Sequence, residues 1–286
     1  MNKKSIIGVS LGGKMLLVGR VTDQKVEKSV VKKINNSDSE SDIISDIISS
    51  INEVMNDSVV GIGFGAPSLV DVEQGIVYSV RRIKSWREVH IKEILEDTLN
   101  IPVYVNNDAN CFAIGEHYFG KGKGVSNLVG LILGVGVGAG IVFKSHLYSG
   151  SNCGAGEYGN IPYKKKDIEH YLSESYFDHK YGLSFDTVYK RALKGDKIAK
   201  TIFEQYGLDL GEAIKILMYS VDPEMIIIGG PISVAYEFYR KAMKESVSEF
   251  VYPHSAMKLK IEVSEQEDIA ILGAAALYYD AHNEVF

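Results

Sequence analysis

Two acids and a run of alternating glycines lie close together in the middle of this chain. Asp108 follows the apolar segment 103–105, Glu157 lies among further glycines, and between the two acids come Gly134, Gly136, Gly138 and Gly140. A carboxylate within hydrogen-bond reach of a hydroxyl can take its proton. Bare backbone lets a phosphate approach main-chain N–H groups, which together form an anion-binding nest. The combination indicates phosphoryl transfer to a hydroxyl, with Asp108 as the base.

Each of these signals also has a purely structural interpretation. Asn107 or Asp108 can be the N-cap of a helix that begins near Ala109, and position alone favours this role as much as catalysis. The glycine run can be a tight hairpin that binds no ligand. Glu157 can be a solvated side chain. A cap and a catalytic role are compatible, so these alternatives stay open.

Hydrophobic periodicity and turn residues predict the elements that position these residues. In the first part of the chain we expect the order β-β-β-α-β-α-β, at about 5–11, 15–22, 26–33, 37–56, 59–64, 89–99 and 102–105. A helix at about 109–119 follows, and then strands at about 127–134, 138–144, 225–228 and 258–263. Further helices are expected at about 167–174, 184–194, 196–220 and 233–250, and from 269 onward. Two halves, each a sheet with helices, predict a ligand cleft between them.

Composition excludes several classes of protein. The 286 residues favour two domains, and 45% hydrophobic with 24% charged residues is ordinary for globular proteins. A net charge of −6 disfavours a nucleic-acid surface, and the lysines at 164–166 are interpreted as a solvated loop. Cys111 and Cys153 form neither a disulfide framework nor a metal set, which fits a reducing cytoplasm. Neither a signal peptide nor a membrane span is expected.

The ordered motifs resemble one known family over nearly the whole chain. They read IGVSLGG, GIGFGAPSLVD, VYVNNDANCFAIGEHYFGKGKG, LILGVGVGAGIVF, LYSGSNCGAGEYGN and DPEMIIIGGPIS. This set resembles the ROK (repressor, ORF, kinase) family of sugar kinases in the actin/hexokinase superfamily. The resemblance implies an α/β fold of two ribonuclease-H-like domains with an interdomain cleft. The implied domains are 1–117, joined by the last helix at about 269–286, and 118–268.

The resemblance also implies a role for each motif residue. Asp108 matches the catalytic base. Residues implied to bind sugar are Asn107, Glu157, Gly65, Ala66, Asn160 and Glu169. Residues implied to bind ATP are Gly12, Gly13, Lys14, Gly134, Val135, Gly136, Gly138, Gly229 and Gly230. Lys14 has an alternative role as an exposed turn lysine.

Several positions depart from the family pattern. Ser10 stands where the family has the Asp of DIGGTK, and Val135 where it has the Thr of LGTGIGGG, which implies weakened ATP use. The cysteine segment of zinc-bearing members is missing after Gly159, and His170 and His179 cannot supply four ligands, so no zinc is expected. Arg81 and Arg82 are interpreted either as a basic pair over the sugar pocket, selecting an anionic or N-acyl sugar, or as surface charge.

The resemblance thus implies an ATP- and Mg²⁺-dependent kinase of a hexose or N-acetylhexosamine, glucokinase-like and cytoplasmic. The alternative is a ROK-fold sugar sensor or pseudo-kinase with weakened nucleotide use. A DNA-binding repressor is disfavoured, because a strand beginning by Ser5 leaves no space for a preceding helix-turn-helix domain. A homodimer is expected from the family, with a contact surface near Tyr171, Tyr176 and Phe177. The expected partner is a small-molecule sugar, with neither nucleic acid nor membrane.

Overall fold

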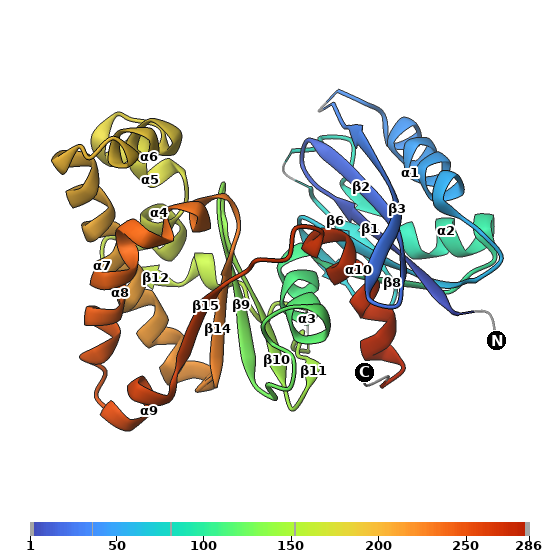
Figure 1. Ribbon diagram of the computed structural model, residues 1–286. Coiled ribbons are helices and arrows are strands. Elements are labelled where there is room, and N and C mark those ends of the chain that lie inside the picture. Colours follow the sequence, from blue (N-terminus) through green and yellow to red (C-terminus); the bar gives the residue numbers. More distant parts are fainter. Residues whose placement is uncertain (1–2, 36, 81, 152, 284–286) are drawn as a thin grey trace. The chain divides into compact units, whose positions relative to one another are not determined.

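The computed structural model describes residues 3–35, 37–80, 82–151 and 153–283. The chain forms two compact units, each a sheet with helices (Figure 1). The first comprises Met1–Gly124, Gly140–Ala155 and Glu265–Phe286, and the second Val125–Ala139 and Gly156–Ser264. The predicted α/β fold class is confirmed. The interdomain cleft and the domain limits stay predictions. Residues 140–155 group with the first unit, whereas the predicted limits assign them to the second domain.

The sheet of the first unit contains five strands in the order β3-β2-β1-β4-β8. Three form an antiparallel meander: β1 (Ser5–Leu11), β2 (Met15–Thr22) and β3 (Lys25–Lys33). Two more, β4 (Val59–Ala66) and β8 (Val103–Asn107), continue the sheet parallel to β1. The sequence predicted all five strands to within about two residues. The carboxyl ends of β1, β4 and β8 therefore lie at one edge.

One face of this sheet is covered by α1 (Glu40–Val54) and α2 (Ile91–Leu99) (Figure 1). The alternating apolar residues of β1 and β4 share a buried core with the isoleucines of α1, including Ile43, Ile47 and Ile51. Helix α1 begins at a capping box in which Ser39 and Asp42 satisfy each other's backbone N–H groups. The helical periodicity of the isoleucines thus predicted both the helix and the face that it buries.

The opposite face is covered by α10 (Ile269–Ala281), which also contacts α3 (Asp108–Phe119). Glycines make this close approach possible. A Cβ added to Gly8 would lie 2.0 Å from the carbonyl oxygen of Ile271, and one added to Gly63 would lie 1.8 Å from that of Ala274. The last helix therefore packs directly on the backbone of β1 and β4.

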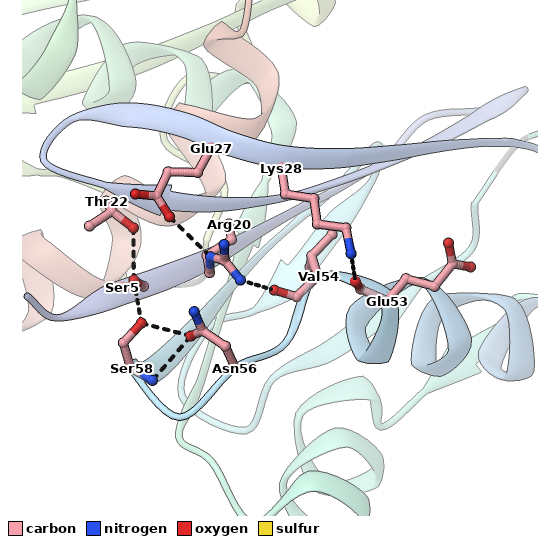
Figure 2. Close-up of polar contacts among 9 residues, drawn as sticks. All are labelled: Ser5, Arg20, Thr22, Glu27, Lys28, Glu53, Val54, Asn56 and Ser58. Atoms are coloured by element: carbon pink, nitrogen blue, oxygen red, sulfur yellow. Dashed lines mark hydrogen bonds and ion pairs between the residues drawn. The ribbon is translucent and has the colours of Figure 1, made fainter. Parts of the chain in front are cut away.

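Polar contacts stabilise the sheet at the amino ends of β1 and β4, as Figure 2 shows. The buried hydroxyl of Ser5 is 2.7 Å from the hydroxyl oxygens of both Thr22 and Ser58. Arg20 donates to the carbonyl oxygen of Val54 at 3.0 Å, and its Nε lies 3.2 Å from Oε2 of Glu27. These contacts fix the edge of the sheet that lies opposite the carboxyl ends of β1, β4 and β8.

A small antiparallel sheet follows β4 and was not expected from the sequence. It consists of β5 (Leu69–Asp71), β6 (Ile76–Tyr78) and β7 (Glu88–Val89). The helix expected to start at Val89 starts instead at Ile91, because Val89 pairs with Val77 of β6. Strands of two or three residues are too short to leave a recognisable periodicity.

The second sheet has the strand order β11-β10-β9-β14-β15. Its strands are β9 (Leu128–Leu133), β10 (Val137–Phe143), β11 (His146–Leu147), β14 (Met225–Gly229) and β15 (Lys260–Val263). Strand β14 is parallel to both β9 and β15. Strand β10 begins in the second unit, and its residues from Gly140 onward belong to the first.

Four helices of the second unit lie near their predicted positions, and the two short helices at 175–181 and 253–258 were not expected from the sequence. In chain order, these helices are α4 (Ile168–Leu172), α5 (Ser175–Tyr181), α6 (Phe185–Leu193), α7 (Lys197–Val221), α8 (Tyr236–Ser248) and α9 (Pro253–Lys258). Other short elements not expected from the sequence are the hairpin strands β12 (Pro162–Tyr163) and β13 (Lys166–Asp167) and the 3₁₀ turns η1 (Tyr158–Asn160) and η2 (Pro231–Ala235). The start predicted for the 233–250 helix falls within η2. In the described part of the chain, no helix combines the length and apolarity required to cross a bilayer.

One surface expectation was confirmed and one was wrong. The lysines at 164–166 are exposed in the hairpin of β12 and β13, as expected, and Lys164 also pairs with the buried carboxylate of Asp209 on α7, which Tyr163 contacts through its hydroxyl at 3.0 Å. Tyr176 and Phe177 are fully buried in the aromatic core of the second unit and provide no contact surface. The sequence showed their apolar character but not which side of α5 was covered.

Candidate functional site

The carboxyl ends of the three parallel strands bring the predicted residues of the first unit together. Ser10 of β1 lies beside Gly65 of β4, and Gly65 lies beside Asn106 of β8. The next pair is Ala66 with Asn107. Parallel α/β sheets bind ligands at this end of their strands. We call this edge, with the 12–14 turn and Asp108, the first strand edge.

A network of asparagines fixes the junction between β8 and α3. The Asn107 side chain accepts a hydrogen bond from the N–H of Ala109 at 2.8 Å and donates one to the carbonyl oxygen of Ser68 at 3.0 Å. The buried Asn106 accepts from the N–H of Asn107 at 2.8 Å. Asn107 is therefore the N-cap, and one of the two structural interpretations of this junction is confirmed.

Asp108 is the first residue of α3, and its side chain is exposed. A carboxylate in the first helical turn interacts favourably with the helix dipole. Because Asn107 supplies the cap, Asp108 does not have to. The junction thus presents an accessible acid on a fixed piece of backbone, which is what a general base requires.

Cys111 lies one turn further along α3 and packs under Gly65. A Cβ on Gly65 would lie 3.1 Å from the Cys111 sulfur, so the glycine leaves room for the thiol. Burial raises the pKa of Cys111 well above its usual range, and the charge of Asp108 raises this pKa further. The thiol is protonated and buried, and it serves as packing under the first strand edge.

The first glycine turn connects β1 to β2. The N–H of Gly12 donates to the carbonyl oxygen of Met15 at 2.7 Å, and the carbonyl oxygen of Lys14 accepts from the N–H of Ile34 at 2.9 Å. The Lys14 side chain is exposed. Arg82 reaches this turn from another part of the chain, because a Cβ on Gly13 would lie 2.4 Å from the Arg82 Cδ. Arg81 lies outside the described residues.

In the second unit, the ends of β9 and β14 bring two glycine segments together. Gly230 has a φ of +85°, and a Cβ there would lie 2.4 Å from the carbonyl oxygen of Leu133. A Cβ on Gly134 would lie 2.9 Å from the ring of Pro231. The predicted nucleotide residues Gly134–Gly138 and Gly229–Gly230 therefore share one edge, which we call the second strand edge.

Glu169 fastens the glycine hairpin of the second strand edge to α4. Its Oε2 accepts a hydrogen bond from the N–H of Val137 at 3.1 Å and would lie 2.8 Å from a Cβ on Gly136. Val135, at the tip of the hairpin, is 53% exposed. The contact found for Glu169 is thus with the glycine hairpin, and its role toward sugar stays a prediction.

Glu157 and Asn160 form a local pair on the η1 turn. The Asn160 side-chain amide donates to the Glu157 carboxylate at 3.0 Å, and both residues are exposed. Glu157 is accessible to solvent, as the solvated interpretation requires, and its role toward sugar stays a prediction. Together they offer a carboxylate and an amide, a suitable set for hydroxyl groups.

The family model described as the ROK family matches residues 6–281. The chain belongs to the ROK family. The glucokinase of Thermotoga maritima is 29% identical, in an alignment that covers 97% of this chain and 98% of that enzyme. The xylose repressor of Caldicellulosiruptor bescii is 28% identical over 77% of this chain, but the match spans only 62% of the repressor. A ROK glucokinase from Streptomyces griseus, solved with glucose and AMPPNP, superposes with a TM-score of 0.79 at 22% identity, covering 96% of this chain and 98% of that one.

Sequence reasoning missed three features of this ROK protein. Asn106 was overlooked although it precedes the recognised pair, because a buried amide gives no periodic signal. The contact of Arg82 with Gly13 and the anchoring of Glu169 to Val137 join residues distant in sequence. Within the described ranges, no three His, Cys, Asp or Glu side chains are grouped to hold a metal ion.

Proposed function

We propose that this ROK protein transfers the γ-phosphoryl group of ATP to a hydroxyl of a hexose or N-acetylhexosamine, as a glucokinase-like enzyme. The observation that carries the proposal is the exposed carboxylate of Asp108, held by the Asn107 cap at the first strand edge. The glucokinase relative, aligned over almost the full length of both chains, supports the same activity.

In the proposed mechanism, Asp108 takes the proton of the attacking sugar hydroxyl. General-base catalysis of this kind contributes about 10² to 10⁴ in rate. The transferred group passes through a loose transition state, so the remaining work is positioning and charge stabilisation. The glycine turns are suited to this work, since Gly12, Gly13, Gly134, Gly136 and Gly138 carry no side chain that would keep phosphate away from the backbone.

Sugar binding is proposed for exposed or accessible polar groups of both units. In the first unit these are Asn107, with the backbone at Gly65 and Ala66. In the second unit they are Glu157, Asn160 and Glu169. The structural bonds of Asn107 use one lone pair and one N–H, so the amide retains capacity for a sugar hydroxyl.

Mg²⁺ is proposed as the metal of the reaction. It binds through one or two carboxylates together with substrate phosphates and water, so it does not need a cluster of protein ligands. Asp108 is assigned to the proton of the sugar hydroxyl and Ser10 carries no charge, so the phosphates of ATP and water would supply most of the metal's ligands. When bound, Mg²⁺ neutralises charge on the β- and γ-phosphates.

The test measures ADP release from Mg-ATP with a panel of neutral hexoses and N-acylhexosamines. We expect turnover with at least one sugar and a decrease in kcat of at least about 10²-fold for Asp108→Asn. The unfolding midpoint of the variant checks that it folds, since the cap of α3 belongs to Asn107 and is kept. Unchanged kcat in Asp108→Asn would remove Asp108 from the mechanism.

A second candidate function is a sugar sensor or pseudo-kinase with weakened nucleotide use. The exposed apolar side chain of Val135 at the hairpin tip favours it, as does Ser10, which places no charge at the end of β1. Sugar-induced thermal stabilisation without ADP release would support the sensor. ADP release that depends on both sugar and Asp108 would exclude it.

The cellular setting is proposed in the same way. We place the protein in the cytoplasm as a homodimer that binds a small sugar and neither nucleic acid nor membrane. The free thiols Cys111 and Cys153 are in keeping with a reducing compartment. Sedimentation equilibrium would test the dimer, and a single species of 31.5 kDa would contradict it.

A further inference from the structure

We propose that Arg82 is an ATP-binding residue of this protein. Its guanidinium group binds the polyphosphate of ATP beside the first glycine turn. The proposal builds on the proposed kinase function and assigns to one side chain a role in nucleotide binding. It replaces the interpretation of Arg82 as a sugar-selecting residue.

The side chain of Arg82 lies on the backbone of Gly13. A Cβ built on Gly13 would be 2.4 Å from the Arg82 Cδ, 2.9 Å from its Cβ and 3.1 Å from its Cγ. These three atoms form the aliphatic stem of the arginine, and Nε is bonded directly to Cδ. The guanidinium group therefore begins at the glycine turn.

The backbone around Arg82 is held by a tight turn. Three hydrogen bonds of 3.0 Å join Val80, Ile83 and Trp86 in this turn: the N–H of Val80 donates to Trp86, that of Ile83 to Val80 and that of Trp86 to Ile83. Ile83 and Trp86 are buried, whereas Arg82, which directly precedes Ile83, is exposed. The turn thus anchors itself in the core and presents Arg82 at its surface. A binding residue placed this way loses little conformational freedom when its ligand arrives.

Charge at the turn favours a polyanion. Arg82 and Lys14 are both exposed, and neither forms an ion pair with any carboxylate of the described residues. The nearest residue of β1 with a polar side chain is the neutral Ser10. Two cations without acidic partners beside bare backbone attract phosphate, and arginine binds it through two parallel hydrogen bonds.

The geometry also gives a reason for glycine at position 13. Gly13 is absent from the described glycines with positive φ, so its backbone conformation does not demand glycine. The side chain of Arg82 occupies the space that a Cβ would need. Gly13 is therefore required by Arg82, and the two residues should act as a coupled pair.

The decisive variant is Arg82→Gln, which keeps carbon atoms at the Cβ, Cγ and Cδ positions on Gly13 and removes the positive charge. We expect the KM for ATP and the Kd for Mg-ATP, measured by calorimetry without sugar, to rise by about ten- to a hundredfold. The KM for sugar should stay within about twofold. Arg82→Ala should behave like Arg82→Gln, and the exposed neighbour Arg87→Ala should match the wild type in all three constants.

A double-mutant cycle tests the coupling. Gly13→Ala alone should raise the Kd for Mg-ATP as Arg82→Ala does, because the methyl group displaces the arginine. In the Arg82→Ala background, Gly13→Ala should have a smaller effect, so that the two changes are not additive. Unfolding midpoints of all variants check that each one folds.

The outcomes separate this inference from the proposed function. Normal Mg-ATP binding by a folded Arg82→Gln overturns the inference and leaves Arg82 as a cover for the turn, whatever the turnover of the wild type. Binding that depends on Arg82, without turnover on any sugar, supports the inference and refutes the kinase. A wild type that does not bind Mg-ATP refutes both.

Discussion

Neighbouring residues at the β8–α3 junction have different tasks. Asn107 satisfies the backbone of the helix and of the Ser68 loop, whereas Asp108 is exposed and does not provide the cap. The sequence left open which of the two is the cap, because both residue types cap helices well. Which residue is the cap depends on where β8 ends, and β8 ends at Asn107.

Asn107→Ala should destabilise the protein by about 1–3 kcal/mol, because the N–H of Ala109 loses its cap and the carbonyl of Ser68 its donor. Asn107→Asp keeps the capping oxygen and should recover part of this loss. Urea unfolding measures both variants. Equal stability of Asn107→Ala and the wild type would show that the cap contributes nothing.

Long periodic elements were predicted well, and short elements were not. The meander of the first unit and the helices α1 and α7 follow directly from their apolar periods. The β5–β6–β7 sheet and the β12–β13 hairpin are stabilised by tertiary contacts, such as that of Lys164 with Asp209, which no local pattern encodes. The candidate site residues could be predicted individually from their motifs. The contacts of Arg82 with Gly13 and of Glu169 with Val137 could not, because each joins residues that are distant in sequence.

Gly63→Ala should destabilise the first unit by at least about 3 kcal/mol, because its Cβ would lie 1.8 Å from a carbonyl oxygen of α10 and the helix would have to move away from the sheet. Gly154→Ala is the matched control, since a Cβ there meets no atom within 4 Å. Thermal unfolding compares the two. Similar midpoints would mean that α10 adapts freely to the added methyl group.

At the scale of the whole molecule, this ROK chain anchors the segment after Gly159 with a buried carboxylate. Asp209 receives the hydroxyl of Tyr163 and the ammonium of Lys164, both from the β12–β13 hairpin that leads into α4 and Glu169. His170 and His179 stack with their ring centroids 5.5 Å apart, an arrangement that packs one ring on the other.

We therefore expect that the protein holds no structural zinc. Metal analysis of the purified protein should give far less than one zinc per chain, and a chelator should leave its unfolding temperature unchanged, since structural zinc contributes directly to folding. Stoichiometric zinc, or a large loss of thermal stability on chelation, would contradict this expectation.

The return of α10 to the first sheet has a consequence for biosynthesis. The ribosome releases β1 and β4 long before residues 269–281 are made, so the glycine face of the nascent sheet remains uncovered while about 200 further residues are translated. The first unit can reach its native state only after translation of α10, which makes this face an expected binding site for chaperones during synthesis.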